Sequence, residues 1–445
     1  MNNWFKHLVL ALFCCFTISL FSQKKWSLED CIEYSKQHNI DVVKQKIRTE
    51  ILHSDIKIAK GNYLPNANFN ALQNFLLGNS FNVSTSVGQR ESSSNSFQLS
   101  SSWNVFNGFK NRYTLEKTKL LKEKYETDID KIQFDLALNI TNKYLQVLFN
   151  KEFLKVAEEQ VEISKKNYNR LKKLYDNGLA DKRELLEIKS TLASDTKEKV
   201  AIKNNVKNSL IELQELLDIK EIENFDIEKI YVDSISLSTD EINEKIIEKN
   251  PQISISKLDI ELKDKDIHLS RVNFYPEVNL NYSYRSNYFH ILGQEDVVFN
   301  QQTKQNEPNG FWIQLNNNRT HFINLTVTIP IFNRFLAKEN YKKAQAELKL
   351  SEAELENNKQ VLRNKIKVAT NDVKTSKTSL KISKTALSTQ KEAFEIVQNQ
   401  YKNGNIGNYE FLESKGKYIQ NASEYIKAKY EYYFKSKILG YYFNR

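Results

Sequence analysis

The sequence contains an internal duplication, and this repeat constrains the fold more than any other feature. The segment Tyr175–Gly178 (YDNG) recurs 226 residues later as Tyr401–Gly404 (YKNG). The same spacing carries Val105–Asn107 (VFN) onto Ile331–Asn333 (IFN). A chain that repeats itself over such a length is expected to fold as two copies of one structural unit. We therefore predict a first structural repeat at residues 23–220, a linker at 221–240 and a second structural repeat at 241–445.

Each repeat contains one long stretch with the periodicity of a coiled coil. Residues 108–178 and 334–404 contain no proline. Apolar side chains recur there at every seventh position, as Ile140, Val147, Leu154, Val161, Tyr168 and Tyr175, and as Ile366, Val373, Leu380, Leu387, Phe394 and Tyr401. Sustained heptads are typical of helices packed side by side in a left-handed coiled coil. A helix of this length extends for about 100 Å.

Two shorter helical stretches flank each long one. They are predicted at residues 28–61 and 184–217, and at 241–272 and 408–438. Because each pair together is about as long as the helix beside it, we expect the short helices to stack end to end; independent helices in ordinary bundles are the alternative. With only 11 Gly and 5 Pro in 445 residues, a loop-rich all-β fold or a doubly wound α/β fold is disfavoured.

Four other segments show a two-residue periodicity, at 66–75, 96–106, 277–289 and 322–332. In the second, Phe97, Leu99 and Trp103 alternate with Ser and Asn, which predicts strands with one apolar and one polar face. Hairpins lying on a core are one interpretation, and a membrane barrel with a wet lumen is the other.

Four strands cannot close a barrel, because the smallest outer-membrane barrels use eight. Several copies of the chain would therefore have to contribute, and three copies would give twelve strands. The sequence does not distinguish a dimer from a trimer. The predicted fold class is mainly α with a small β part, with long coiled-coil helical hairpins and four strands per chain.

The start of the chain predicts export. Residues 1–22 read as a signal peptide, in which Lys6 precedes an apolar stretch at 8–21 that is too short to span a membrane. A retained anchor is the alternative. Cleavage would leave Cys31 as the single cysteine of the mature chain, so no internal disulfide could form.

Composition and motifs argue against nucleic-acid binding and against catalysis. The formal net charge is +10, but Lys and Glu alternate along stretches such as 342–356, as on solvated helix faces. No HExxH, GxSxG, Walker or Rossmann pattern is present. We therefore predict no enzyme activity, no catalytic residue, no cofactor and no metal site.

Taken in order, the motifs of the mature chain resemble those of the TolC family of outer-membrane efflux proteins. The carriers of this resemblance are the duplicated halves, Asn250-Pro251 at the opening of the second half, Leu64-Pro65 and Tyr275-Pro276 at the strand entries, Trp103–Gly108 and Ile329–Asn333 at the strand-to-helix exits, and the two Tyr-x-x-Gly turns. Three departures are Arg334 in place of the family's usual glycine, the missing proline before Phe106, and a longer interval at Ser286–Thr320, which we expect to be an extracellular loop.

The resemblance implies a homotrimer with a 12-stranded β-barrel in the outer membrane and a helical tunnel in the periplasm. Such a channel-tunnel would take substrate from a periplasmic adaptor protein and an inner-membrane pump, in efflux or type I secretion, and conduct it passively to the exterior. A periplasmic coiled-coil scaffold or adaptor without a pore is the alternative function. That alternative is disfavoured because compact adaptor domains are rich in Gly, which is scarce here.

The resemblance also places candidate residues at the hairpin tips, residues 177–183 and 403–409, which would form the periplasmic mouth. Glu410 and Glu413 match acidic positions that constrict the pore, where a trimer would create rings of three carboxylates that favour cations. Acidic residues in the first turns of a helix also stabilise the helix dipole, by about 0.3–1 kcal/mol, which is the simpler interpretation. Glu184 and Glu187 are the weaker candidates in the first repeat.

The tips contain four further candidates. Gly178 and Gly404 are expected to permit a tight reversal of the chain. Leu179 and Ile406 are expected to be exposed and to contact the adaptor.

Overall fold

The computed structural model describes residues 25–78, 80–82, 87–89, 91–219, 225–230 and 244–443. The predicted signal peptide and most of the predicted linker lie outside these residues. The described chain divides into two compact units: a helical unit within Met1–Ile47, Glu126–Ile255 and Glu356–Arg445, and a second unit, which contains the sheet, within Arg48–Tyr125 and Ser256–Leu355. Each unit contains parts of both repeats, so the compact units are not the sequence repeats.

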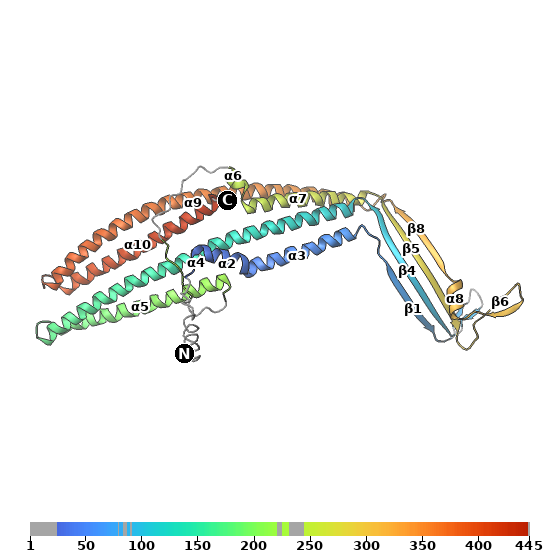
Figure 1. The fold of residues 1–445 in the computed structure, drawn as a ribbon. Coiled ribbons are helices and arrows are strands. Elements are labelled where there is room, and N and C mark those ends of the chain that lie inside the picture. Colours follow the sequence, from blue (N-terminus) through green and yellow to red (C-terminus); the bar gives the residue numbers. More distant parts are fainter. Residues whose placement is uncertain are drawn as a thin grey trace, which may run out of the picture. The chain divides into compact units, whose positions relative to one another are not determined.

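The long helices reproduce the duplication. Helix α4 (Lys110–Asp176) and helix α9 (Leu336–Lys402) each have 67 residues. Each reverses into a shorter antiparallel helix, α5 (Lys182–Leu217) or α10 (Asn408–Phe443), of 36 residues (Figure 1). All four boundaries of the second pair lie 226 residues after those of the first. The predicted duplication and the predicted long helices are therefore confirmed.

The remaining helices are shorter and interrupted. They are α2 (Leu28–His38), α3 (Ile40–Gly61), α6 (Glu244–Glu248) and α7 (Pro251–Arg271). Ser27 and Asp30 form a capping box that starts α2. The predicted helix 28–61 is broken at Asn39, whose extended backbone ends α2 and whose side chain accepts a hydrogen bond from the Asp41 amide and donates one to the Leu216 carbonyl. The end of α5 thus lies at the α2–α3 junction.

The sheet has four antiparallel strands in the order β1-β4-β5-β8 (Figure 1). The strands are β1 (Asn68–Leu76), β4 (Ser92–Asn107), β5 (Glu277–Ile291) and β8 (Thr320–Thr328). All four predicted strands are present, with shifted ends. Strand β8 ends before Pro330, which cannot donate to the ladder.

The register gives the sheet an apolar face and a polar face, because directly paired residues share a face. The apolar face carries Phe69, Phe97, Leu99, Trp103, Val278, Leu280, Tyr282, Tyr284, Ile323, Leu325 and Val327. On the polar face most side chains are Ser, Asn or Thr, including Ser100, Ser102, Asn104, Asn279, Asn281, Ser283, Asn324 and Thr326. The outer edges of β1 and β8 have no partner strand within the described residues.

The interval Ser286–Thr320, predicted to be a loop, is largely ordered secondary structure. Strand β5 continues to Ile291, and the antiparallel pair β6 (Val297–Asn300) and β7 (Gln305–Pro308) follows. The seven-residue helix α8 (Phe311–Asn317) then leads to β8. A further short pair, β2 (Ser80–Asn82) and β3 (Val87–Gln89), lies between β1 and β4. None of the described helices combines the length and apolar character needed to cross a membrane.

The repeated Phe-Asn motif forms the exit from strand to long helix. The Asn107 side chain accepts a hydrogen bond from the Asn111 amide, and Asn333 accepts one from the Ala337 amide. The next residue, Gly108 or Arg334, has a left-handed backbone with φ of 62° or 55°. Arg334 therefore adopts the conformation of the glycine that it replaces in the repeat.

The two exits predict opposite responses to substitution. Gly108→Ala should lower the melting temperature of the purified protein, because an alanine Cβ would lie 2.7 Å from Tyr275 Cβ and a left-handed residue costs about 1–2 kcal/mol. Arg334→Gly should leave stability unchanged or raise it by less than about 1 kcal/mol, because the relief of strain is offset by the entropy of glycine in the unfolded chain. A loss of stability in Arg334→Gly as large as that in Gly108→Ala would contradict this account.

Candidate functional site

Both hairpins of the helical unit reverse through the same hydrogen-bonded turn. At the first tip the Gly178 amide donates to the Tyr175 carbonyl (2.9 Å) and the Leu179 amide to the Leu174 carbonyl (2.8 Å). This pair of bonds is a Schellman motif, which requires a left-handed residue after the helix. Gly178 supplies that conformation with φ of 72°.

The second tip repeats this geometry. The Gly404 amide donates to the Tyr401 carbonyl (3.2 Å) and the Asn405 amide to the Gln400 carbonyl (3.0 Å). Gly404 has φ of 76°, and a Cβ on it would meet nothing within 4 Å. The Tyr-x-x-Gly motif is therefore a helix stop, and its glycine is needed for backbone conformation rather than for close packing.

After the turn the two tips differ. In the first, Leu179 is 74% exposed, and Asp181 caps α5 by accepting a hydrogen bond from the Arg183 amide (2.6 Å). In the second, Ile406 is half-buried against an aromatic cluster of Phe394, Tyr401, Phe411 and Tyr418. Of the two residues predicted to offer an exposed contact, Leu179 is exposed, whereas Ile406 contributes to the core of its own hairpin.

The aromatic cluster links the second tip to the first hairpin. The guanidinium of Arg170, on α4, lies 4.9 Å from the centre of the Tyr401 ring. Arg170 also donates to the Lys402 carbonyl (2.7 Å), so a cation binds the C-terminal end of α9. The pKa of Tyr401 is raised: burial is the main cause, Arg170 opposes it, and the Glu184 carboxylate raises it further.

The four candidate carboxylates lie in different environments. Glu410 is exposed and has no hydrogen bond or ion pair within the part of the chain that the structure describes. Glu413 is half-exposed and pairs with Lys417 at 2.7 Å, which raises the pKa of Lys417. Glu187 accepts a hydrogen bond from Asn408 (3.4 Å), and Glu184 is half-buried.

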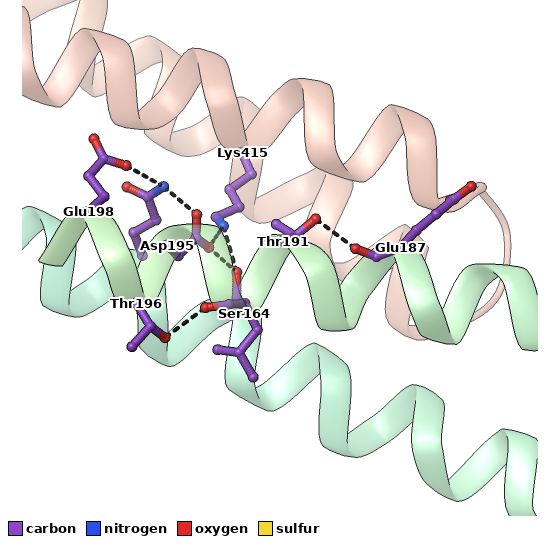
Figure 2. A network of polar contacts seen from close by, with 9 residues as sticks. Ser164, Glu187, Thr191, Asp195, Thr196, Glu198 and Lys415 are labelled. Atoms are coloured by element: carbon purple, nitrogen blue, oxygen red, sulfur yellow. Dashed lines mark hydrogen bonds and ion pairs between the residues drawn. The ribbon is translucent and has the colours of Figure 1, made fainter. Parts of the chain in front are cut away.

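A buried polar network that the sequence did not predict ties the two hairpins together about two turns beyond the second tip. Lys415 on α10 donates to Asp195 on α5 (2.5 Å) and to Ser164 on α4 (2.6 Å), as Figure 2 shows. Ser164 and Gln160 also donate to the Asp195 carboxylate. The side chains of Lys415 and Asp195 are 5% and 7% exposed, so both charges are buried, and both are hydrogen-bonded.

The network breaks the symmetry of the repeat. Lys189, the counterpart of Lys415 in the first repeat, is exposed. A signal was nevertheless present in the sequence, because Lys415 lies between the buried Phe411 and Tyr418 on one stripe of α10. Asp195 likewise lies seven residues from both Ile188 and Ile202, which are buried on α5.

Among the described residues, no group of three His, Cys, Asp or Glu side chains could hold a metal ion. The tips present charged and apolar side chains, and the network lies buried between the two hairpins. The network connects α4, α5 and α10.

Comparisons with known proteins agree with this architecture. The family model described as outer membrane efflux protein matches residues 32–218 and 243–437, one segment in each repeat. The Campylobacter jejuni CmeC outer membrane channel has a similar structure, with a TM-score of 0.77 and 17% identity over 93% of this chain and 85% of that chain. No curated protein matches the sequence.

Two other solved structures are similar over the same share of the chain. The Vibrio cholerae outer membrane protein VceC has a TM-score of 0.71 and 14% identity, over 93% of this chain and 95% of that chain. The open state of the Neisseria gonorrhoeae MtrE outer membrane channel has a TM-score of 0.73 and 15% identity, over 93% of this chain and 88% of that chain. The fold of these proteins is shared across nearly their whole length.

The buried network predicts a strong stability effect. Lys415→Met should lower the free energy of unfolding by about 3–5 kcal/mol, because it leaves the Asp195 charge buried without its partner. Thermal unfolding of the purified protein, followed by circular dichroism at the helical bands, measures this loss.

Two matched variants control this experiment. Lys189→Met, at the exposed counterpart position, should change stability by less than about 0.5 kcal/mol. Combining Lys415→Met with Asp195→Leu should recover most of the loss, since no lone charge then remains buried. A double variant as unstable as Lys415→Met alone would show that the network does not act as a charge pair.

Proposed function

Because the chain belongs to the outer membrane efflux protein family, we propose that three copies form a channel-tunnel in the cell outer membrane, with the helical part in the periplasm. In this assembly the pore conducts substrate passively from the periplasm to the exterior. The observation that carries the proposal is the four-stranded sheet, which has one apolar face, one polar face and, among the residues that the structure describes, two edges without a partner strand.

The sheet has the features of one third of a membrane barrel. Unpaired strand edges are unfavourable in lipid, so a spanning sheet has to close on itself. Strands β1 and β8 each have nine residues, and pairing β8 of one copy with β1 of the next would join three sheets into a ring of twelve strands. The apolar face would contact lipid, and the polar face would line a wet lumen.

The helical hairpins would form the wall of the tunnel, with their tips at its periplasmic mouth. Exposed Leu179 is the tip residue that we propose for contact with a periplasmic adaptor protein, which would connect the channel to an inner-membrane pump. Ile406 would support this surface from within the second hairpin. An uncovered sheet with one apolar and one polar face is not expected in a pore-free scaffold.

Electron microscopy of the detergent-extracted protein tests the assembly. We expect particles with three-fold symmetry, longer than about 100 Å, with a barrel at one end. Particles with two-fold symmetry would contradict the trimer, and a pore-free rod that needs no detergent would favour the scaffold.

Substituting the tip carboxylates tests the aperture. In planar bilayers, Glu410→Gln should lower the cation-over-anion permeability ratio, because a ring of three unpaired charges is removed. Glu413→Gln should lower it less, because Lys417 already offsets that charge, and Lys417→Met should raise it. The permeability ratio is measured from the reversal potential in a salt gradient.

Glu184 provides the matched control, since it occupies the position of Glu410 in the first repeat. Glu184→Gln should leave the permeability ratio nearly unchanged. If Glu184→Gln and Glu410→Gln lower the permeability ratio equally, the assignment of the aperture to the second tip is wrong.

A further inference from the structure

Helix α8 packs on the apolar face of the sheet. The Phe311 ring makes edge-to-face contacts with Phe97 (6.3 Å between centroids) and Tyr288 (5.0 Å). Ser286 donates a hydrogen bond to the Leu315 carbonyl (2.5 Å). Phe97 and Ser286 are paired, and both lie on the same face as Leu99 and Tyr284. The helix therefore covers the outward side of the proposed barrel wall.

Side chains of α8 and of Asn318 also provide hydrogen bonds to the part of β5 that β8 does not reach. Pairing between β5 and β8 stops at Arg285, although β5 continues to Ile291. Beyond this point the Gln314 amide accepts a hydrogen bond from the Phe289 N–H and donates one to the Phe289 carbonyl, both at 3.0 Å. Asn318, just after the helix, donates to the Asn287 carbonyl (2.7 Å). Gln314 is only 8% exposed, so its buried amide provides partners for the backbone of β5 at a point that β8 does not reach.

The side of α8 away from the sheet exposes two large apolar side chains beside Asn316 and Asn317. Trp312 is 79% exposed and Ile313 is 44% exposed. No contact within the described chain accounts for a tryptophan presented in this way, apart from the edge of the neighbouring Phe311 ring. Trp312 and Ile313 form a small apolar surface on a short helix that is held to the sheet by hydrogen bonds. Such a surface indicates contact with molecules outside the chain.

The position of α8 identifies its surroundings. From Val278 to Ser286 the apolar face extends for about 26 Å along the strand, or about 20 Å in height at a strand tilt of about 40°. Barrels have an apolar band about 25 Å tall with aromatic residues at both borders. Under α8 the same face carries Tyr288 and Asn95, and beyond the helix it carries Ser93 and His290, so the helix lies where the face changes from apolar to polar.

We propose that α8 is an interfacial anchor, with Trp312 and Ile313 inserted at the boundary between lipid acyl chains and headgroups. This inference rests on the proposed barrel. Tryptophan is favoured at that boundary because its ring is apolar and its N–H can still reach water. The hydrogen bonds from Gln314 and Asn318 to β5 fit the same location, since unpaired backbone groups are costly where water is scarce.

Tryptophan fluorescence in brominated lipid tests the anchor. In a variant with Trp4, Trp26 and Trp103 changed to Phe, Trp312 is the only tryptophan. The protein is reconstituted in phosphatidylcholine vesicles with bromine either near the headgroup end or near the methyl end of the acyl chains. We expect a larger loss of Trp312 emission with bromine near the headgroup.

Two neighbouring positions separate this inference from the proposed function. In a protein without native tryptophans, Leu99→Trp places the probe on the apolar face and Ser100→Trp places it on the polar face. Bromine should quench the first and not the second. If Leu99→Trp is not quenched, the proposed barrel fails; if it is quenched and Trp312 is not, only the anchor fails.

The remaining outcomes identify other surroundings for Trp312. Quenching by aqueous iodide alone would place Trp312 in water, and protection from both quenchers would place it against a second copy of the chain; each result overturns the anchor. A second measurement uses otherwise native protein, so that it does not depend on the triple substitution. There, Trp312→Phe should reduce the emission that bromine near the headgroup quenches, and the quenched emission that remains should come from Trp103 on the apolar face.

Discussion

The outer backbone groups of β1 and β8, which no other strand of the described chain pairs, are the constraint on which the rest of this structure depends. A nine-residue edge leaves several N–H and C=O groups without partners, and a sheet with a largely apolar face cannot expose that face to water at low cost. Both problems are solved together if copies of the chain join edge to edge in a membrane. Where β8 is too short to protect β5, the side chains of Gln314 and Asn318 satisfy the remaining groups instead.

The two repeats share one framework, and a few residues make each repeat different from the other. The four long-hairpin boundaries, the Asn side chains at the helix starts and the Schellman turns recur at one spacing. Arg334 shows that the backbone of the repeat can override a residue's own preference, because it keeps the left-handed conformation of Gly108. Lys415 and Lys189 show that one residue type at matching positions can have two environments, since Lys415 is buried and Lys189 is exposed.

The sequence predicted the helices and strands that have a periodic pattern, and it missed the features that depend on single contacts. Heptads predicted α4 and α9, and alternation predicted the four strands of the sheet. The break at Asn39 depends on hydrogen bonds to Asp41 and Leu216, and α8 depends on contacts with β5, so neither leaves a periodic pattern. At the site, the turn glycines were predictable from the repeated motif, whereas the half-burial of Ile406 was not, because it depends on the partner helices of its own hairpin. Assignments of Glu410, Glu413 and Leu179 to pore and adaptor stay predictions.

The buried Lys415–Asp195 pair also fixes the alignment of the helices, which apolar heptads alone leave ambiguous. Apolar heptads allow one helix to slide along another by seven residues and still bury similar side chains. A shift of this kind would separate Lys415 from Asp195 and bury two lone charges, at a cost of several kcal/mol. Arg170 on the Lys402 carbonyl and Asn408 on Glu187 are further contacts that form in a single alignment. Polar contacts between the hairpins therefore fix their axial register, while the heptads place apolar side chains between the helices.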